Sequence, residues 1–212
     1  MNARLQKLNY PLYCITAREF SNGRSTEAVV RAMLDGGAKI IQYREKSISI
    51  KQQYCECMLV RKLTDAAGAT FIVNDHADIA LAVHADGVHI GQDDMPIAIV
   101  RSLVGNNMII GVSTHTPEQA CTAVADGADY IGVGPLYRTN TKVDVCAPVG
   151  LAYLDYAVDN ISIPFVAIGG IKEHTLSEVL AHGAKCVALV SEITSANDIS
   201  DTVKRIKAGI KE

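Results

Sequence analysis

The sequence lacks the features that mark membrane, secreted and disordered proteins. None of its apolar runs approaches the roughly 18 residues that cross a membrane. Residues 1–10 (MNARLQKLNY) have no apolar centre of the kind found in secretory signals. No long block of like charge and no low-complexity tract interrupts the chain, and 49% of its 212 residues are hydrophobic, which disordered chains do not reach. We therefore expect a globular, cytoplasmic protein.

Cysteine and excess positive charge are also scarce. Six cysteines in a chain of 212 residues are too few for a disulfide framework. Cys55 and Cys57 lie two positions apart on an expected helix, where their side chains diverge, so we interpret all six as reduced and mostly packing residues. The 20 basic and 23 acidic side chains give a net charge of −3, which is unlike the basic surface of a general nucleic-acid binder.

Eight short apolar runs recur along the chain, each with the length of a strand. Most are rich in valine and isoleucine, and their apolar residues are nearly continuous, which is typical of parallel strands that are buried on both faces. The runs cover residues 12–16, 39–45, 70–75, 87–91, 108–113, 130–135, 164–170 and 186–191.

Helical patterns lie between most of these runs. Residues 49–67 and 197–209 carry apolar side chains every three to four positions. Thr116 before Pro117 has the pattern of a helix N-cap with proline in the first turn. Glycine supplies the left-handed residue that ends a helix, and we expect this role for Gly37, Gly68, Gly127, Gly183 and the pair Asp86-Gly87.

Alternating strands and helices predict an α/β protein, a single (β/α)8 TIM barrel domain over residues 1–212. The chain is near the lower end of the length range for this fold. The alternative is an open, doubly wound sheet. No G-x-G-x-x-G turn follows the first expected strand, which argues against a dinucleotide-binding version of that alternative.

Polar residues gather where the expected strands end, and in such barrels the active site lies at the carboxyl ends of the strands. Gln42, Arg44 and Lys46 alternate at the end of the second strand and therefore share one face. Later strand ends and loops supply Asn74, Asp75, His89, Asp94, Ser113, His115, Thr139, Thr141, Lys142, Gly170 and Ser191.

The charges in this set predict a pyrophosphate site. Three cations from the ends of two strands, Arg44, Lys46 and Lys142, would be costly to bring together unless an anion with several charges lies among them. Asp75 and Asp94 follow neighbouring strands, and carboxylate oxygens of this kind suit Mg²⁺ that also bridges to phosphate oxygens. Magnesium is therefore the expected cofactor.

A second anion site is expected at the ends of the seventh and eighth strands. There Gly170 would let backbone N–H groups approach a phosphate, and Ser191 would add donors at a helix start. Taken singly, these residues also have structural explanations. Asp75 has the position of a helix cap, His89 that of a buried hydrogen-bonded histidine, and His115 fits either an acid–base group or a structural hydrogen bond.

Seven segments together resemble the thiamine phosphate synthase family, also called thiamine-phosphate pyrophosphorylase. They are QYREK (42–46), ND (74–75), GVHIGQDD (87–94), GVSTH (111–115), GVGPLYRTNTK (132–142), AIGGI (167–171) and ALVS (188–191). The resemblance covers essentially the whole chain and implies a (β/α)8 barrel. It also implies a Mg²⁺-dependent transferase that joins 4-amino-5-hydroxymethyl-2-methylpyrimidine diphosphate to 4-methyl-5-(2-hydroxyethyl)thiazole phosphate, releasing pyrophosphate and thiamine phosphate.

The resemblance implies a role for each matching residue. Gln42 would bind the aminopyrimidine, and Asp75 and Asp94 would bind Mg²⁺. The diphosphate and its departure would depend on Arg44, Lys46, Asn74, Ser113 and Lys142. The remaining substrate contacts would come from Thr139 and Thr141 on the loop after the sixth strand, and from Gly170, Val190 and Ser191 around the thiazole phosphate. Arg138 departs from the family pattern, which often has proline there.

Three other functions stay open at this point. A thiazole tautomerase of the same superfamily shares the segment from Ser113 to His115 but does not need the diphosphate-binding residues. The others are a non-catalytic thiamine phosphate binder and another magnesium-dependent barrel enzyme that acts on a phosphorylated small molecule. The expected partners are small-molecule substrates; no nucleic acid and no membrane partner is expected, and a homodimer stays open.

Overall fold

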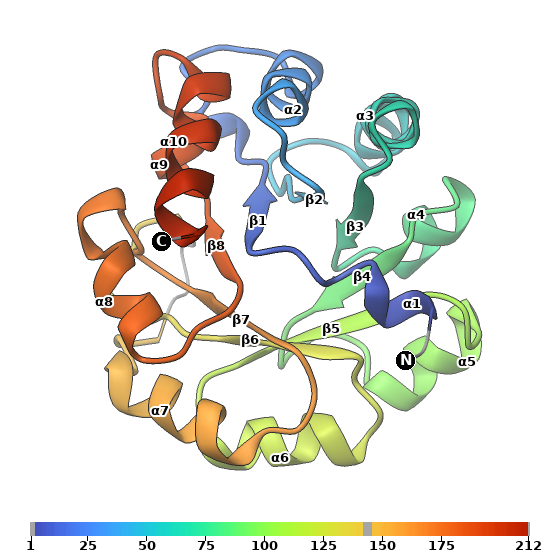
Figure 1. Cartoon of the computed structure of the whole chain (residues 1–212). Coiled ribbons are helices and arrows are strands. Elements are labelled where there is room, and N and C mark those ends of the chain that lie inside the picture. The colour runs from blue at the N-terminus through green and yellow to red at the C-terminus, as the bar shows by residue number, and fades with distance from the viewer. Residues whose placement is uncertain (1–2, 142–145, 212) are drawn as a thin grey trace.

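The chain forms a closed barrel of eight parallel strands, joined in the order β1 to β8 (Figure 1). The structure, a computed structural model, describes residues 3–141 and 146–211. Pairing of β1 with β8, in the register Leu12 with Val187, closes the barrel. The predicted (β/α)8 fold is therefore confirmed, and the alternative prediction of an open, doubly wound sheet was wrong. The strands are β1 (Leu12–Ile15), β2 (Ile40–Tyr43), β3 (Thr70–Asn74), β4 (Gly87–Ile90), β5 (Ile109–Thr114), β6 (Tyr130–Val133), β7 (Phe165–Ile168) and β8 (Val187–Leu189).

Helices form a ring outside the strands (Figure 1). The longer ones are α2 (Thr26–Asp35), α3 (Ile50–Ala67), α4 (Ala77–Ala82), α5 (Ile97–Val104), α6 (Pro117–Ala125), α7 (Gly150–Asn160), α8 (Leu176–Ala181) and α10 (Ile199–Lys211). Single turns are α1 (Ala3–Gln6), η1 (Arg18–Phe20), η2 (Glu173–Thr175) and α9 (Ser191–Thr194). None of the helices in the described part of the chain has the length and apolar character needed to cross a membrane.

Local sequence signals set several helix ends. The Ser49 hydroxyl accepts the backbone N–H of Gln52 at 3.3 Å and caps α3. Thr116 caps α6 in the same way, with proline at its start, as predicted. Four of the predicted stop residues have left-handed φ values from +58° to +90°, which glycine adopts without steric cost; they are Gly37, Gly68, Gly127 and Gly183.

The prediction that Asp86-Gly87 ends a helix was wrong. The left-handed residue after α4 is His84, at φ +52°. Gly87 instead begins β4 on the inside of the barrel, where an added Cβ would lie 2.7 Å from Ile72 and 2.8 Å from Ile109. Glycine is required at this position by the crowded barrel interior, which the local sequence does not reveal.

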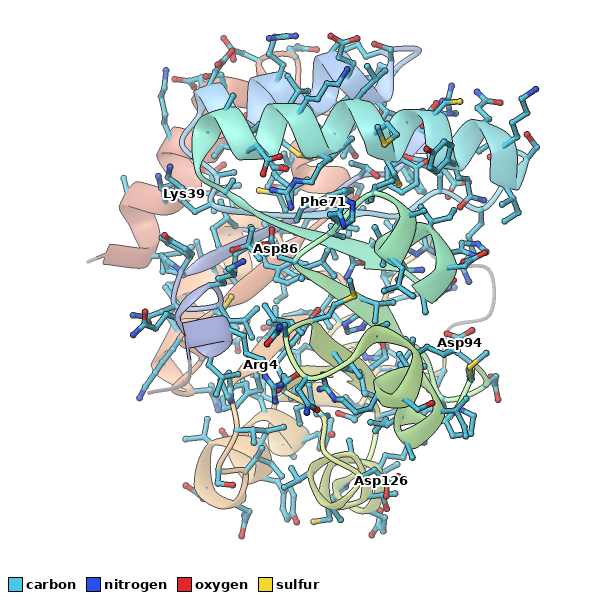
Figure 2. The ribbon with its side chains drawn as sticks, turned by 90° about the vertical axis from the view of Figure 1, so that its right-hand side faces the viewer. Arg4, Lys39, Phe71, Asp86, Asp94 and Asp126 are labelled. Atoms are coloured by element: carbon cyan, nitrogen blue, oxygen red, sulfur yellow. The ribbon has the colours of Figure 1, made fainter. Side chains whose placement is uncertain are left out.

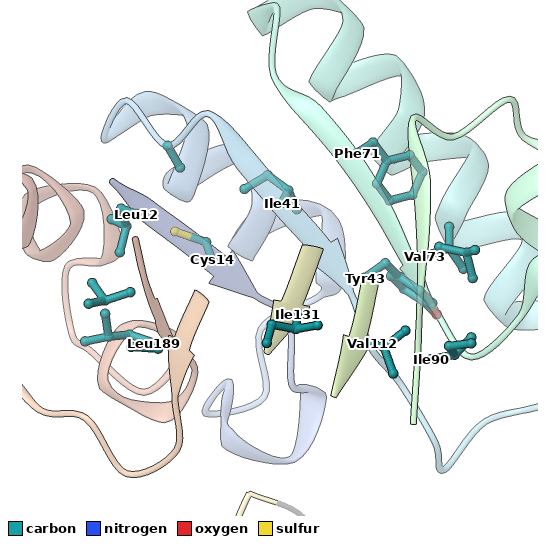
Figure 3. Packing of buried hydrophobic residues seen from close by; sticks show 14 of the residues in the cluster. Leu12, Cys14, Ile41, Tyr43, Phe71, Val73, Ile90, Val112, Ile131 and Leu189 are labelled. Atoms are coloured by element: carbon teal, nitrogen blue, oxygen red, sulfur yellow. The ribbon is translucent and has the colours of Figure 1, made fainter. Parts of the chain in front are cut away.

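Every strand is buried on both faces, which explains its nearly continuous apolar sequence. Outward-facing side chains such as Leu12, Cys14, Ile41 and Phe71 form one layer against the helices (Figure 3). The residues between them point inward and form a second cluster that includes Tyr13, Ile40, Ile72, Ile109 and Tyr130. Burial of each large apolar side chain contributes about 1.5–3 kcal/mol. All six cysteines are free, and Cys14, Cys57 and Cys186 are buried in this packing as predicted. Cys55, Cys121 and Cys146 are exposed, so the prediction that most of the cysteines pack in the interior was wrong for these three.

Ion pairs at the amino end of the barrel hold the strands to the outer helices. The Asp86 carboxylate accepts the backbone N–H of Phe71 at 2.8 Å and an Arg61 guanidinium N–H at 2.9 Å, and it also pairs with Lys7. Figure 2 shows Asp86 towards the end of the barrel opposite Asp94. Burial acts to raise the pKa of Asp86, but hydrogen bonds from these three donors outweigh it and lower the pKa.

We expect Asp86→Asn to lower the free energy of unfolding by about 1–3 kcal/mol at pH 7, because Arg61 and the Phe71 N–H lose a charged partner. A carboxyl with a lowered pKa contributes its full stability above the ordinary value of about 3.9 and loses it as the pH falls through the lower, folded-state pKa. The difference from the parent protein should therefore shrink as the pH is lowered from 7 towards 3. Urea unfolding at both pH values measures this, with Asp126→Asn at an exposed position as the matched control. A constant difference would show that the charge of Asp86 does not contribute.

Candidate active site

A cavity of about 530 Å³ opens at the carboxyl ends of the strands, which is where the sequence placed the site. Its lining includes nine of the predicted site residues: Gln42, Arg44, Asn74, Ser113, Thr139, Thr141, Gly170, Val190 and Ser191. Lys46, Asp75 and Asp94 lie beside it and interact with one another. Lys142 lies outside the described residues, so its predicted role stays a prediction.

Two carboxylates and a lysine form the acidic side of the site. Lys46 Nζ lies 3.2 Å from Asp75 Oδ2. Asp94 Oδ2 accepts the backbone N–H of Gly91 at 2.6 Å. Burial raises the pKa of Asp75, and the nearby Asp94 carboxylate raises it further, whereas Lys46 opposes both effects. Negative charge on this pair is therefore only partly compensated by the lysine.

This pair suits a hard divalent cation. Asp75 does not cap α4, since the residue before that helix is His76; its backbone N–H instead donates to the His89 carbonyl oxygen at 2.8 Å. No cluster of three or more acidic, histidine or cysteine side chains suited to a metal occurs within residues 3–141 and 146–211. Magnesium commonly binds to one or two carboxylates and completes its shell with water and phosphate oxygens, so two aspartates match its needs.

Arg44 is a partly buried cation whose Nε lacks a hydrogen bond to the described residues. Its Nη1 donates to the Thr141 carbonyl oxygen at 3.3 Å, while its buried Nε has no hydrogen-bond partner among the described residues. Burial lowers the pKa of Arg44, and Asp75 is the first of the acidic groups that oppose this. A guanidinium stays charged in proteins, and a buried donor without a partner costs about 1–3 kcal/mol or more. The guanidinium lines the cavity, so an anion bound there would compensate its positive charge.

Residues 138–141 of the loop after β6 line the cavity. The hydroxyl oxygens of Thr139 and Thr141 lie 2.9 Å apart, and the Tyr137 backbone N–H donates to the Gly169 carbonyl oxygen at 2.9 Å. Gly170 has φ +68°, and a Cβ there would lie 2.6 Å from the Arg138 carbonyl oxygen. The structure thus gives Gly170 a reason the sequence did not suggest, close contact with this loop, while its predicted phosphate contact stays a prediction.

A second cation lies near the ends of β7 and β8. Lys172 lines the cavity; its Nζ donates to Ser191 Oγ at 3.4 Å and pairs with Glu192 at 2.9 Å. Sequence reasoning missed Lys172, although it follows the Gly169-Gly170 pair by two positions. Ser191 begins α9 and Val190 precedes it, so this side combines a lysine, a hydroxyl and backbone donors.

The floor of the cavity holds a continuous chain of polar side chains inside the barrel. Gln42 Nε2 donates to the Tyr13 hydroxyl at 2.9 Å, and the Tyr13 and Tyr130 hydroxyl oxygens lie 2.8 Å apart. His89 Nδ1 lies 2.9 Å from the Tyr130 hydroxyl, and His89 Nε2 lies 2.9 Å from Ser113 Oγ. His89 is thus buried and hydrogen-bonded, as the structural interpretation of this residue predicted.

The two tyrosines of this chain escaped sequence reasoning because they occur within apolar strand segments. Burial raises the pKa of both Tyr13 and Tyr130, so both hydroxyls remain protonated at neutral pH. Gly111, which pairs with Tyr130 across β5 and β6, makes room for the tyrosine ring, because an added Cβ would lie 2.1 Å from it.

His115 makes the structural hydrogen bond that was one of its two interpretations. Its Nδ1 lies 2.5 Å from the Gly134 carbonyl oxygen. A carbonyl oxygen only accepts, so Nδ1 carries the proton. The His115 backbone N–H also donates to Gln119 Oε1 at 2.7 Å. These two bonds hold the histidine against the strand ends.

Most of the chain is similar to proteins of one family. A family model described as thiamine monophosphate synthase matches residues 12–193. The thiamine-phosphate synthase of Pelotomaculum thermopropionicum is 58% identical over 201 residues, which cover 95% of this chain and 92% of that protein. The thiamine-phosphate synthase of Lawsonia intracellularis is 55% identical over 203 residues, covering 96% and 94% of the two chains.

Solved structures extend this similarity to the fold. The thiamine phosphate pyrophosphorylase from Pyrococcus furiosus superposes with a TM-score of 0.89 at 35% identity, over 97% of this chain and 98% of that one. An aldolase structure at 18% identity has a TM-score of 0.69 and shares the barrel fold alone.

We expect Arg44→Met to weaken the binding of inorganic pyrophosphate at least tenfold, about 1.4 kcal/mol, without destabilising the fold. Arg44 forms no ion pair with a described side chain and is partly desolvated, so loss of its charge also removes a desolvation cost. Calorimetric titration with pyrophosphate and Mg²⁺, together with thermal unfolding, measures both effects. Arg31→Met, which removes an exposed guanidinium on α2, is the matched control. Unchanged pyrophosphate affinity in Arg44→Met would place the anion elsewhere.

Proposed function

This chain belongs to the thiamine monophosphate synthase family and is a transferase, and we propose that it joins the two substrates named in the sequence analysis. In that reaction, 4-amino-5-hydroxymethyl-2-methylpyrimidine diphosphate and 4-methyl-5-(2-hydroxyethyl)thiazole phosphate give thiamine phosphate and pyrophosphate. One observation carries the proposal: basic side chains lie on two opposite sides of a single cavity, Arg44 on one side and Lys172 on the other. Arg44, Lys46 and the aspartates follow β2 to β4, whereas Lys172 and Ser191 follow β7 and β8, on the other side of the barrel (Figure 1).

The first side fits a diphosphate. The guanidinium of Arg44 lines the cavity and supplies charged donors that suit a diphosphate oxygen, and Asn74 adds an amide next to Asp75. Asp75 and Asp94 would hold Mg²⁺, which when bound neutralises negative charge on phosphate oxygens. Lys46 adds a further cation, and Lys142 is predicted to meet the leaving group.

The second side fits a monophosphate. Lys172 Nζ and Ser191 Oγ lie within hydrogen-bond distance of each other at 3.4 Å, so one phosphate can accept from both. Backbone N–H groups at Gly170, Val190 and Ser191 are further donors. The thiazole phosphate would bind here, with its ring nitrogen turned towards the pyrimidine on the cavity floor.

The chemistry needs a stabilised leaving group and no protein nucleophile. The bond between the pyrimidine methylene carbon and the diphosphate oxygen breaks, and its electron pair leaves with pyrophosphate. The methylene cation is stabilised by the electron-rich aminopyrimidine, whose amino group Gln42 orients. The thiazole nitrogen then donates its lone pair to this carbon and forms the new carbon–nitrogen bond. Arg44 and Ser113 stabilise charge that grows on the departing oxygens, and the cavity holds the two rings in line.

The direct test mixes the purified protein with both substrates and Mg²⁺ and follows thiamine phosphate by thiochrome fluorescence. We expect product that requires both substrates and disappears when EDTA removes the metal, and that returns when Mg²⁺ is restored. Folded protein that forms no product would contradict the proposal and favour a thiazole tautomerase. Product formation that persists in EDTA would contradict the proposed metal dependence but would still support the proposed reaction.

We expect Asp75→Asn to lower kcat by about a hundredfold or more and to raise the Mg²⁺ concentration needed for half-maximal activity, because one metal ligand loses its charge. The fold should persist, since Asp75 does not cap α4. Asp78→Asn, three positions further on and exposed, is the control and should leave both quantities unchanged. Near-normal turnover of Asp75→Asn would remove Asp75 from the metal site.

A further inference from the structure

The polar chain on the cavity floor joins two predicted substrate-binding residues through three side chains that have no assigned role. Gln42 and Ser113 are its ends, and Tyr13, Tyr130 and His89 connect them through four contacts of 2.8–2.9 Å. The linking groups are buried, with Tyr13 2% and Tyr130 1% exposed. Its members come from β1, β2, β4, β5 and β6, so the chain spans most of the barrel interior.

We propose that this is a one-way hydrogen-bond relay in which every proton points from Gln42 towards Ser113. Gln42 donates to Tyr13, Tyr13 to Tyr130, Tyr130 to His89, and His89 to Ser113, whose own hydroxyl proton points into the cavity. The relay makes Tyr13, Tyr130 and His89 positioning residues for the two ends. The contribution of the relay to catalysis rests on the proposed function. The direction of the relay does not, because it follows from donors and acceptors within the protein.

The direction follows from counting protons. The Gln42 amide nitrogen only donates, so the Tyr13 oxygen accepts there. Tyr13 has one hydroxyl proton, and Tyr130 is its other hydrogen-bond partner among the described residues. If Tyr130 donated to Tyr13 instead, the Tyr13 proton would be buried without an acceptor, which costs about 1–3 kcal/mol. Tyr13 therefore donates to Tyr130.

The same argument sets the tautomer of His89. Tyr130 accepts from Tyr13 and passes its own proton to His89 Nδ1. An imidazole nitrogen that accepts carries no proton, so Nε2 carries it and donates to Ser113 Oγ. The Ser113 oxygen then accepts a hydrogen bond from His89, and the Ser113 hydroxyl proton remains available for donation to a group bound in the cavity.

Both ends of the relay then match the chemistry of the proposed substrate. With its nitrogen turned to Tyr13, Gln42 presents its carbonyl oxygen, which accepts from the exocyclic amino group of the pyrimidine. Ser113 presents a hydroxyl proton, which an anionic diphosphate oxygen accepts. Reversal of the relay would invert both ends together, so that an amide N–H would face the amino group and a lone pair would face the anion. One direction serves both subsites.

Nitrogen NMR of the histidine rings tests the direction without any substrate. In protein labelled with ¹⁵N histidine, His89 should be a neutral imidazole with its proton on Nε2. Its signals are identified by their loss in His89→Gln and, independently, by their shift in Tyr130→Phe. A proton on Nδ1 would overturn the relay direction whether or not the enzyme forms thiamine phosphate. In Tyr130→Phe, where Nδ1 loses its donor, we expect a mixture of tautomers.

Kinetics test what the relay does. Tyr130→Phe should raise KM for the pyrimidine diphosphate and lower kcat, with an overall loss of about tenfold in kcat/KM, and should leave KM for the thiazole phosphate unchanged. In a Ser113→Ala background the same substitution should cost at least threefold less, because one end of the relay is already gone.

Tyr43→Phe is the matched control. It removes another buried tyrosine hydroxyl, one that donates to Glu56 at 3.0 Å on the outer face of the barrel. An equal loss of activity in Tyr43→Phe, or fully additive effects of Tyr130→Phe and Ser113→Ala, would reject the positioning role. If no variant and no parent protein forms product, the proposed function fails, and the NMR result still decides the relay.

Discussion

Closure of the barrel by the pairing of β1 with β8 is the constraint on which the rest of this structure depends. It brings every strand end to one rim and forces alternate residues of each strand into a shared interior. Small residues at crowded inward positions, such as Gly87 and Gly111, leave space for Ile72 and the ring of Tyr130. The cavity floor exists because inward positions of five different strands meet there.

The charged side chains at the two ends of the barrel differ in how far partners within the protein compensate their charge. At the amino end, Asp86 and Asp129 each accept a backbone N–H and pair with arginines, so their charge is compensated within the protein. At the carboxyl end, Asp75 lies near the like charge of Asp94, and Arg44 keeps a donor without a partner among the described residues. Compensated charge stabilises the fold, whereas incompletely compensated charge is available for ligands.

The interior relay adds a neutral counterpart to these charges. Ionic groups attract anions strongly but do not orient a flat ring, because Coulomb attraction has little directional preference. Hydrogen bonds, in contrast, have a strong directional preference. In the proposed reaction, a chain of neutral groups anchored in a rigid barrel would therefore orient the pyrimidine and the serine hydroxyl, while Arg44 and the carboxylate pair would act on the diphosphate. Removal of one middle hydroxyl should affect both ends, since each proton position depends on its neighbours.

The sequence by itself determined the eight strands, several helix ends and the polar rim, because periodicity and capping depend on residues within a few positions of each other. The rim residues Gln42, Arg44, Asn74 and Ser113 were predictable because strand ends share one edge of a parallel barrel. Only the tertiary structure decided the contact between Tyr13 and Tyr130, which are 117 positions apart, the place of Lys172 beside Ser191, and the reason for glycine at 87. These features depend on which strands become neighbours when the barrel closes, and no local pattern in the chain records that.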